Sequence, residues 1–168
     1  IEQYKDIETQ YRKILANKEI PLRVVHHDTK ISNVLFDDKD EGLCVIDLDT
    51  VMPGYYFSDV GDMMRTYLSE TTEEETDISK IQIRPEILKA IYDGYMEEMS
   101  SVLTDQEKEL FYYSGKFMIY MQALRFLTDY LNDDCYYHTT YPQHNLDRAR
   151  NQLVLLQRYI QALQTAIV

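Results

Sequence analysis

The sequence predicts a mostly helical α+β domain with one short β-rich segment near its N-terminal end. Apolar residues recur every three or four positions over most of the chain, which is the spacing of a helix face. Between residues 22 and 48, short apolar runs alternate with polar turns, which is typical of strands. Only 5 Gly and 4 Pro occur in 168 residues, which argues against a loop-rich or disordered chain.

The composition is that of one globular domain. Hydrophobic residues make up 45% and charged residues 27% of the chain, and its length is sufficient for one sizeable core. The 17 basic and 29 acidic side chains give a formal net charge of −12. This balance disfavours nucleic acid as a partner, because binding to a phosphate backbone requires clustered Lys and Arg. The acidic excess either keeps the surface solvated or suits a cationic substrate.

The chain contains two cysteines, Cys44 and Cys135. They form no disulfide framework, and Cys44 lies in an apolar, strand-like run, where we expect a small core residue. No apolar run approaches the roughly 20 residues of a membrane span. These features predict a cytoplasmic protein without a membrane partner.

The sequence pattern of the N-terminal third predicts one helix followed by three strands. The helical face consists of Tyr4, Ile7, Tyr11 and Ile14. Residues 17–21 end this helix, and short apolar runs at 22–25, 34–36 and 43–48 predict the strands. The polar, Gly-containing segment 37–42 predicts a turn that joins the last two strands.

From residue 55 onward every predicted element is helical. The first helix presents one apolar face, made of Val60, Met63, Met64, Tyr67 and Leu68. The acidic, Thr-rich segment 70–77 predicts a solvated loop. A proline opens the helix predicted for residues 85 to about 99. Thr104 and Glu107 form a capping-box pattern at the start of a long helix.

Two long helices close the chain, and each carries an apolar stripe that alternates steps of three and four residues. The first stripe is Leu110, Tyr113, Phe117, Tyr120, Leu124, Leu127 and Leu131. The second stripe is Leu146, Ala149, Leu153, Leu156, Ile160, Leu163 and Ile167. We expect these helices to pack against each other or against the domain core, with a coiled-coil dimer as the alternative.

The residues that indicate chemistry lie between positions 26 and 62. The first group reads His26-His27-Asp28-Thr29-Lys30-Ile31-Ser32-Asn33 and separates the first two predicted strands. The second group, Val45-Ile46-Asp47-Leu48-Asp49, ends the third strand. The third group, Asp59-Val60-Gly61-Asp62, lies in the first helix after the strands.

These groups meet the requirements of phosphoryl transfer. An enzyme of this kind must hold Mg²⁺ on nucleotide phosphates and must orient an acceptor hydroxyl and accept its proton. Asp28 can face the hydroxyl as the catalytic carboxylate, while Asn33 and Asp47 offer the hard oxygen ligands that Mg²⁺ prefers. The alternative is that these residues only form turns, which Asp and Asn favour.

The strand period adds an expectation about Asp47 and Asp49. Side chains alternate faces along a strand, so both carboxylates share one side if the strand stays extended that far. Two like charges so close together are costly unless a cation neutralises them, and Mg²⁺ can do so. Asp49 is therefore either a further metal ligand or a substrate contact.

The His-x-Asp-x-x-x-x-Asn loop resembles the catalytic loop of the aminoglycoside phosphotransferase/choline kinase superfamily, which is related to the protein kinases. Asp47 matches the metal-binding Asp of that superfamily, and Asp59 matches a downstream Asp that braces the catalytic loop. The resemblance implies the C-terminal catalytic lobe of a protein-kinase-like fold, which uses ATP and Mg²⁺ to phosphorylate a small molecule. His26 is interpreted as a second residue that supports the loop.

A narrower resemblance covers most of the chain. The segments that carry it are residues 26–30, residues 45–54, Ala123 to Leu131, and His144 to Arg150, and they look like bacterial N-acetylhexosamine 1-kinases. This resemblance implies phosphorylation of the anomeric hydroxyl of an amino sugar. The acceptor alternatives are an aminoglycoside, choline, homoserine or a similar small molecule, and a non-catalytic kinase-fold remnant is the alternative from another class.

The sequence also departs from the family pattern. His27 occupies a position where aminoglycoside kinases usually carry Gly, and Ser32 replaces a more usual Asn of the narrower group. No Gly-rich loop or strand Lys for ATP precedes the first helix. We therefore expect residues 1–168 to be one catalytic lobe of a longer protein, with the N-terminal nucleotide lobe outside this chain and activity incomplete without it.

Two basic residues are further site candidates. Lys30 lies in the catalytic loop and either contacts an ATP phosphate or is solvated. Arg125 either reaches the cleft to bind the sugar or pairs with Asp129 four residues later. The sequence leaves both alternatives open, and it does not indicate an oligomeric state.

Overall fold

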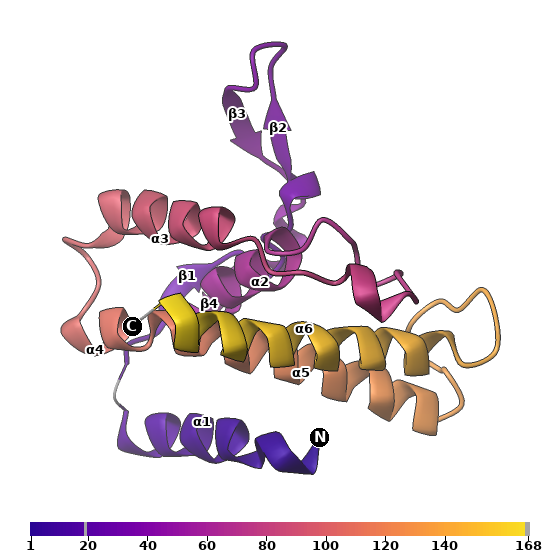
Figure 1. Ribbon diagram of the computed structural model, residues 1–168. Helices are drawn as coiled ribbons and strands as arrows, with labels where there is room; N and C mark the ends of the chain where they lie inside the picture. The colour runs from indigo at the N-terminus through magenta and orange to yellow at the C-terminus, as the bar shows by residue number, and fades with distance from the viewer. Residues whose placement is uncertain (19, 167–168) are drawn as a thin grey trace.

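A computed structural model describes residues 1–18 and 20–166 (Figure 1). The α-helices are α1 (Lys5–Asn17), α2 (Phe57–Tyr67), α3 (Pro85–Met99), α4 (Asp105–Glu109), α5 (Phe111–Leu131) and α6 (His144–Ala166). The strands are β1 (Arg23–Val25), β2 (Val34–Phe36), β3 (Gly42–Val45) and β4 (Met52–Gly54). Short 3₁₀ turns are η1 (Glu2–Tyr4), η2 (Ile31–Asn33), η3 (Leu48–Thr50) and η4 (Ile78–Lys80). The mostly helical α+β prediction is confirmed.

The strands form two small antiparallel sheets. β2 and β3 make a hairpin in which Val34 lies opposite Val45, as expected from the turn between them. β1 pairs with β4, with Val24 opposite Pro53. The β1–β4 pair was not predicted, because β4 is three residues long and contains both Pro and Gly, which are unfavourable in strands. The β1–β4 pair brings together the two ends of segment 26–51, which contains the polar loop and the projecting hairpin (Figure 1).

The third strand is shorter than predicted, so the expectation that Asp47 and Asp49 share one face of a strand is wrong. β3 ends at Val45, and Asp47 adopts a left-handed backbone conformation with φ of 62°. η3 begins at Leu48, so Asp49 lies in a 3₁₀ turn. An Asp side chain tolerates the left-handed region better than most residues, which allows the chain to leave the strand here.

The prediction that Cys44 is a core residue is wrong. Cys44 is exposed, as is every residue of β3. On the hairpin, Leu35, Phe36, Leu43 and Val45 are also exposed. The apolar run predicted the strand correctly, but the hairpin projects from the helical body and neither of its faces is covered by the described residues (Figure 1).

The core lies between α2, α5 and α6. α6 runs along α5, and α2 packs on the same pair, so the predicted contact between the two long helices is confirmed (Figure 1). α1 covers the first half of α5, where the Tyr11 ring stacks on Phe117 with centroids 4.0 Å apart. Among the described residues, no helix is long and apolar enough to cross a membrane.

The predicted stripes hold only in part. The first four residues of the α5 stripe, from Leu110 to Tyr120, are buried, but Leu131 is 70% exposed. Ala123 and Phe126 are buried in its place, because the second half of α5 turns another face toward α6. Ala149, Leu156 and Leu163 of the α6 stripe are buried, and Leu146, Leu153 and Ile160 are half-buried. Ile167 lies outside the described residues.

The long helix expected after Thr104 is two helices. The predicted capping box is present: Glu107 N–H donates to the Thr104 hydroxyl, and the Glu107 carboxylate accepts from Thr104 N–H. α4 nevertheless ends at Glu109, and α5 begins at Phe111 after a non-helical Leu110. The capping-box pattern therefore predicted the start of α4 correctly. The continuous apolar periodicity did not indicate the break between α4 and α5.

Gly61 permits the close approach of α2 to α5. A Cβ at this position would overlap Met118 and the backbone carbonyl of Ser114. Backbone cannot yield as a flexible side-chain tip can, so any larger residue must separate the two helices. Gly94 in α3 is the opposite case, because no described atom outside its own stretch of helix backbone lies within 4 Å of the place of its missing Cβ.

We predict opposite effects for alanine at these two glycines. Gly61→Ala should destabilise the protein by about 1–3 kcal/mol through overpacking. Gly94→Ala should stabilise it by about 0.5–1 kcal/mol, because alanine favours the helix and meets no neighbour. Thermal denaturation of both variants measures this. A Gly61→Ala variant as stable as the wild type would show that the α2–α5 contact adjusts without cost.

Candidate active site

The catalytic-loop residues lie between β1 and β2, and Asp59 of α2 fastens them. The Asp59 carboxylate accepts hydrogen bonds from His26 N–H at 2.9 Å and from His27 N–H at 2.8 Å. The Thr29 hydroxyl donates to the Asp59 carbonyl at 2.8 Å. Asp59 lies in the first turn of α2, but its side chain bonds to the loop rather than capping the helix. This is the geometry that a loop-supporting residue requires.

His26 links the loop to the chain that follows β3. Asp28 N–H donates to His26 Nδ1 at 3.3 Å, so Nε2 must carry the imidazole proton. Nε2 then donates to the Ile46 carbonyl oxygen, which lies 2.9 Å from it. The His26 ring therefore joins the backbone of Asp28 to the residue directly before Asp47.

The backbone conformation at His27 explains why aminoglycoside kinases usually carry Gly at this position. Its φ is 69°, in the left-handed region that glycine adopts freely. Its Nδ1 lies 2.6 Å from the Ser58 hydroxyl, and its ring occupies the space that a side chain on Gly54 would need. His27 thus packs beneath the loop, between α2 and β4, and does not point to Asp28.

Asp28 is held by Asn33 and Lys30. Asn33 Nδ2 donates to the Asp28 carbonyl and to its Oδ2, both at 2.9 Å. Lys30 Nζ lies 2.8 Å from the same Oδ2. Burial alone raises the pKa of Asp28, but these hydrogen bonds and the charges of Lys30 and Arg65 outweigh it and hold the pKa below its ordinary value. The carboxylate is therefore ionised at neutral pH.

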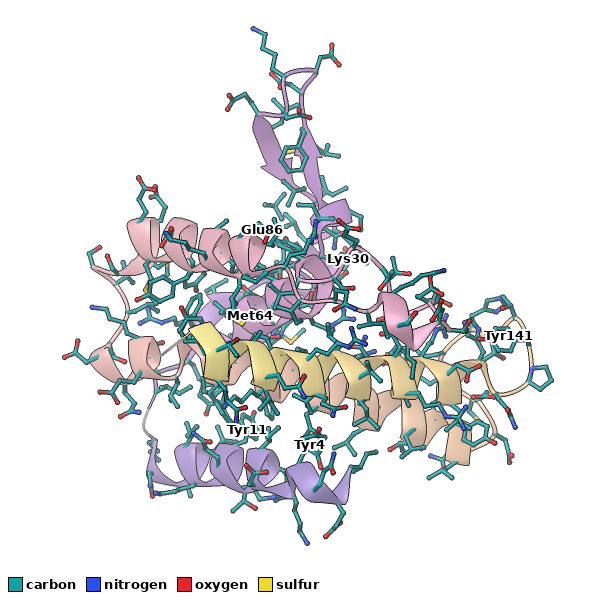
Figure 2. All side chains as sticks on the ribbon, in the orientation of Figure 1. Tyr4, Tyr11, Lys30, Met64, Glu86 and Tyr141 are labelled. Carbon is teal, nitrogen blue, oxygen red and sulfur yellow. The ribbon has the colours of Figure 1, made fainter. Side chains whose placement is uncertain are left out.

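Lys30 lies among acidic groups. The hydrogen bond to Asp28 raises the pKa of Lys30, with further contributions from the charges of Asp28, Asp47 and Asp62 against the effect of burial. Figure 2 shows Lys30 between the base of the hairpin and the helical body. Its side chain is 42% exposed, so an anionic ligand can approach it.

The proposed metal ligands are only partly brought together. Ile46 N–H donates to the Asn33 carbonyl at 2.9 Å, so the hairpin places Asn33 beside the residue that precedes Asp47. Asp49 lies two residues further on, in η3. Within residues 1–18 and 20–166, no group of three or more His, Cys, Asp or Glu side chains is arranged to hold a metal. An Asn–Asp pair still fits Mg²⁺, which commonly takes one or two carboxylates and fills its shell with water and phosphate oxygens.

The sequence reasoning missed Arg65. Arg65 donates to Asp62 at 2.8 Å and to Glu73 at 2.6 Å, and its side chain is largely buried. Burial raises the pKa of Asp62 although Arg65 acts in the opposite direction. The three-residue spacing of Asp62 and Arg65 on a helix is a signal that could have indicated this pair.

The acidic segment 70–77 is fastened to α6 rather than simply solvated as predicted. Glu74 accepts from Arg148 Nε at 2.9 Å and pairs with His144. Asn151 Nδ2 donates to the Thr72 carbonyl at 3.1 Å and to the Glu75 carbonyl at 2.9 Å. These partners are more than 65 residues away in sequence, so the local composition could not indicate them.

Arg125 lies apart from the catalytic loop. Its guanidinium group lies over the rings of Tyr136 and Tyr137, and a cavity at the far end of α5 surrounds it without any residue of 26–33. The Asp129 carboxylate accepts instead from the N–H groups of Tyr136 and Tyr137. The structure therefore does not show the pairing of Arg125 with Asp129, and its contact with the sugar stays a prediction.

A model of the phosphotransferase enzyme family matches residues 2–88, just over half of the chain. The matched range contains the loop from His26 to Asn33, the hairpin, and α2 with Asp59. The chain belongs to this family. Together with the observed architecture, membership confirms the predicted kinase-like, phosphotransferase class.

Proposed function

We propose that the full-length protein transfers the γ-phosphoryl group of ATP to a hydroxyl of a small molecule, with Asp28 as the catalytic carboxylate. The observation that carries this proposal is the ionised Asp28, held by Asn33 and Lys30 in a loop that Asp59 braces. A turn-forming Asp has no need of three such supports. The family match supports the reaction class.

Each loop residue has a distinct task in the proposed mechanism. Asp28 accepts the hydrogen bond of the substrate hydroxyl and orients its oxygen toward the γ-phosphorus. It takes the hydroxyl proton as the new O–P bond forms and the bond between the γ-phosphorus and the leaving ADP breaks. Its lowered pKa suits this role, because phosphoryl transfer through a loose transition state needs orientation more than a strong base. Lys30 stabilises negative charge on the transferred group.

Asn33 and Asp47 are proposed to hold Mg²⁺, with Asp49 assisting. When bound, Mg²⁺ would neutralise negative charge on the nucleotide phosphates. His26 keeps Asp28 and the Ile46–Asp47 segment in register through its two ring nitrogens. The rest of the ATP site is proposed to come from an N-terminal lobe outside residues 1–168.

The proposed acceptor is an amino sugar of the N-acetylhexosamine type, phosphorylated at its anomeric hydroxyl. The sequence segments 45–54, 123–131 and 144–150 support this choice through the resemblance described above. Arg125 lines a separate cavity with Tyr136 and Tyr137, and its contact with the sugar stays a prediction.

An acceptor panel tests the proposed function. ADP formation by the full-length protein with Mg²⁺ is measured for N-acetylglucosamine, N-acetylgalactosamine, an aminoglycoside, choline and homoserine. We expect turnover with an N-acetylhexosamine and a product whose phosphorus signal couples to the anomeric proton. Residues 1–168 alone should be inactive. Turnover of another acceptor would replace the amino sugar, and the absence of turnover with any small hydroxyl compound would overturn the kinase proposal.

A further inference from the structure

A groove of about 460 Å³ lies between α2 and α3, and none of the proposed catalytic or metal-binding residues lines it. Its wall contains half-buried side chains of Met63 and Tyr67 from α2 and of Ile87, Tyr95 and Met99 from α3. α3 runs along the outside of the molecule (Figure 1). The groove is therefore an open apolar surface, separate from the catalytic loop.

The groove has the length and the floor that a packed helix requires. Its α3 residues span positions 87 to 99, which corresponds to about 18 Å along a helix axis. Ala90 and Gly94 lie in the middle of this span, one turn apart, and both are exposed. Two small residues on one ridge leave room for the backbone of a second helix to approach α3 closely.

The described chain offers no structural reason for a glycine at position 94. The φ of Gly94 is not positive, so its backbone conformation is open to any residue. Glycine within a helix is unfavourable relative to alanine. At Gly61 neighbouring atoms of α5 exclude a side chain, whereas the place of a Gly94 side chain is open space. The missing side chain therefore points to a contact that the described residues do not supply.

Carboxylates border the groove, and among the described residues that line it none is basic. Glu98 lies in its wall, while Glu86 and Glu97 lie one turn before and one turn after the two small residues. All three are exposed. Lys89, the only basic residue in the α3 sequence, pairs with Asp93. The three other carboxylates have no basic partner within residues 1–18 and 20–166.

This combination of shape and charge selects one class of occupant. An anionic lipid surface or a nucleic acid would meet an uncompensated negative border. A second copy of the chain would bring two acidic α3 helices together. A helix with an apolar stripe flanked by Lys or Arg matches both the groove and the carboxylates. The net charge of −12 also attracts such a partner over a longer range.

We propose that the α2–α3 groove is the docking site for a basic amphipathic helix of a partner protein. The apolar stripe of that helix packs over Ala90 and Gly94, and its Lys or Arg side chains lie beside Glu97 and Glu98. The inference goes beyond the proposed kinase function and does not depend on it, because no residue of the groove takes part in the proposed mechanism.

Methionine methyl signals of the full-length protein report directly on this groove. Met63 and Met99 line it, whereas Met52 and Met121 are exposed elsewhere. The probe is a synthetic peptide of about 15 residues, or four helical turns, with Leu at steps of three and four and Lys on both flanks. The control peptide carries Glu in place of each Lys. We expect the Lys peptide to shift the Met63 and Met99 signals saturably, with a Kd below about 1 mM. The Met52 and Met121 signals should stay unchanged, and the Glu peptide should shift none of the four.

Three variants separate the groove from general attraction to an acidic protein. Gly94→Gln fills the groove without a charge and should raise the Kd of the Lys peptide at least about tenfold. Glutamine favours a helix more than glycine does, so thermal denaturation should show no loss of stability. Glu98→Gln should raise the Kd about 2–5-fold. Glu41→Gln removes the same charge from the exposed β2–β3 turn and should leave the Kd unchanged.

Four results would overturn the docking site as proposed. Two of them are unchanged Met63 and Met99 signals up to about 1 mM Lys peptide, and an unchanged Kd in the folded Gly94→Gln variant. Equal binding of the Lys and Glu peptides would contradict a basic partner. A shift of the Met63 and Met99 signals on raising the protein concentration alone would assign the groove to a second copy of the chain. The acceptor panel decides the kinase function separately.

Discussion

Replacing Asp28 by Asn in the full-length protein is expected to lower kcat by about 10²–10⁴-fold, the usual contribution of a positioned proton acceptor. Asparagine keeps the size of the side chain and can still accept a hydrogen bond from Asn33 and Lys30. It cannot take the proton of the substrate hydroxyl, and it removes the carboxylate that pairs with Lys30. The affinity for ATP should be little changed, because the proposed metal ligands Asn33 and Asp47 remain.

Asp38→Asn is the matched control for Asp28→Asn. Asp38 is an exposed residue of the β2–β3 turn, so its substitution changes the net charge equally without touching the loop. Initial-rate kinetics with varied ATP and varied acceptor separate an effect on kcat from one on either KM. An Asp28→Asn enzyme with wild-type kcat would falsify the assignment of Asp28, while the family membership would be unaffected.

Elements with local signals were predicted well from the sequence. α3 spans the predicted residues because Pro85 favours the first turn of a helix. The start of α4 was predicted because Thr104 and Glu107 satisfy each other's backbone groups. The loop with Asp28 and Asn33 was predicted from its His-x-Asp-x-x-x-x-Asn pattern, and only four residues lie between the two side chains that bond to each other. In each case the interacting groups are close in sequence.

Features that depend on distant partners were not predicted. Cys44 was placed in the core because an apolar run does not reveal whether a helix covers it. The left-handed backbone at Asp47 ended the strand where the residue pattern still favoured extension. A cavity beside the catalytic loop is lined by Lys30 of the loop, Arg65 of α2 and Gln152 of α6. Their apposition follows from the packing of α2 and α6 on α5, and no spacing rule along the chain describes it.

A buried ion pair outside the active site gives the second large expected effect. Glu107 is fully buried, and its carboxylate accepts from Arg23 Nε and Nη2, each at 2.6 Å. The pair ties α4 to β1, which leads directly into the catalytic loop. Glu107→Ala should lower the free energy of unfolding by about 3–5 kcal/mol, because Arg23 is left without its counter-ion. Thermal and chemical denaturation measure the loss.

Asp93→Ala serves as the control, because the Lys89–Asp93 pair is exposed on α3 and no measurable change is expected there. A double variant, Arg23→Met with Glu107→Leu, should recover much of the lost stability, since removing both charges leaves neither one buried alone. Equal stability of the single and double variants would show that the capping box of α4, rather than the ion pair, is what Glu107 supplies.

The pH dependence of this loss follows from the pKa of Glu107. Burial raises that pKa, but hydrogen bonds from Arg23 and Thr104 outweigh it and hold it below its ordinary value. A carboxyl group with a lowered folded-state pKa stabilises the protein fully above its unfolded-state pKa, about 4.3, and loses the contribution as pH falls through the folded-state value. The difference in unfolding free energy between wild type and Glu107→Ala should therefore be constant near pH 7 and shrink below about pH 4. A difference that grew in acid would mean that Glu107 is protonated more readily in the folded protein than in the unfolded chain, which would contradict its ionised pairing with Arg23.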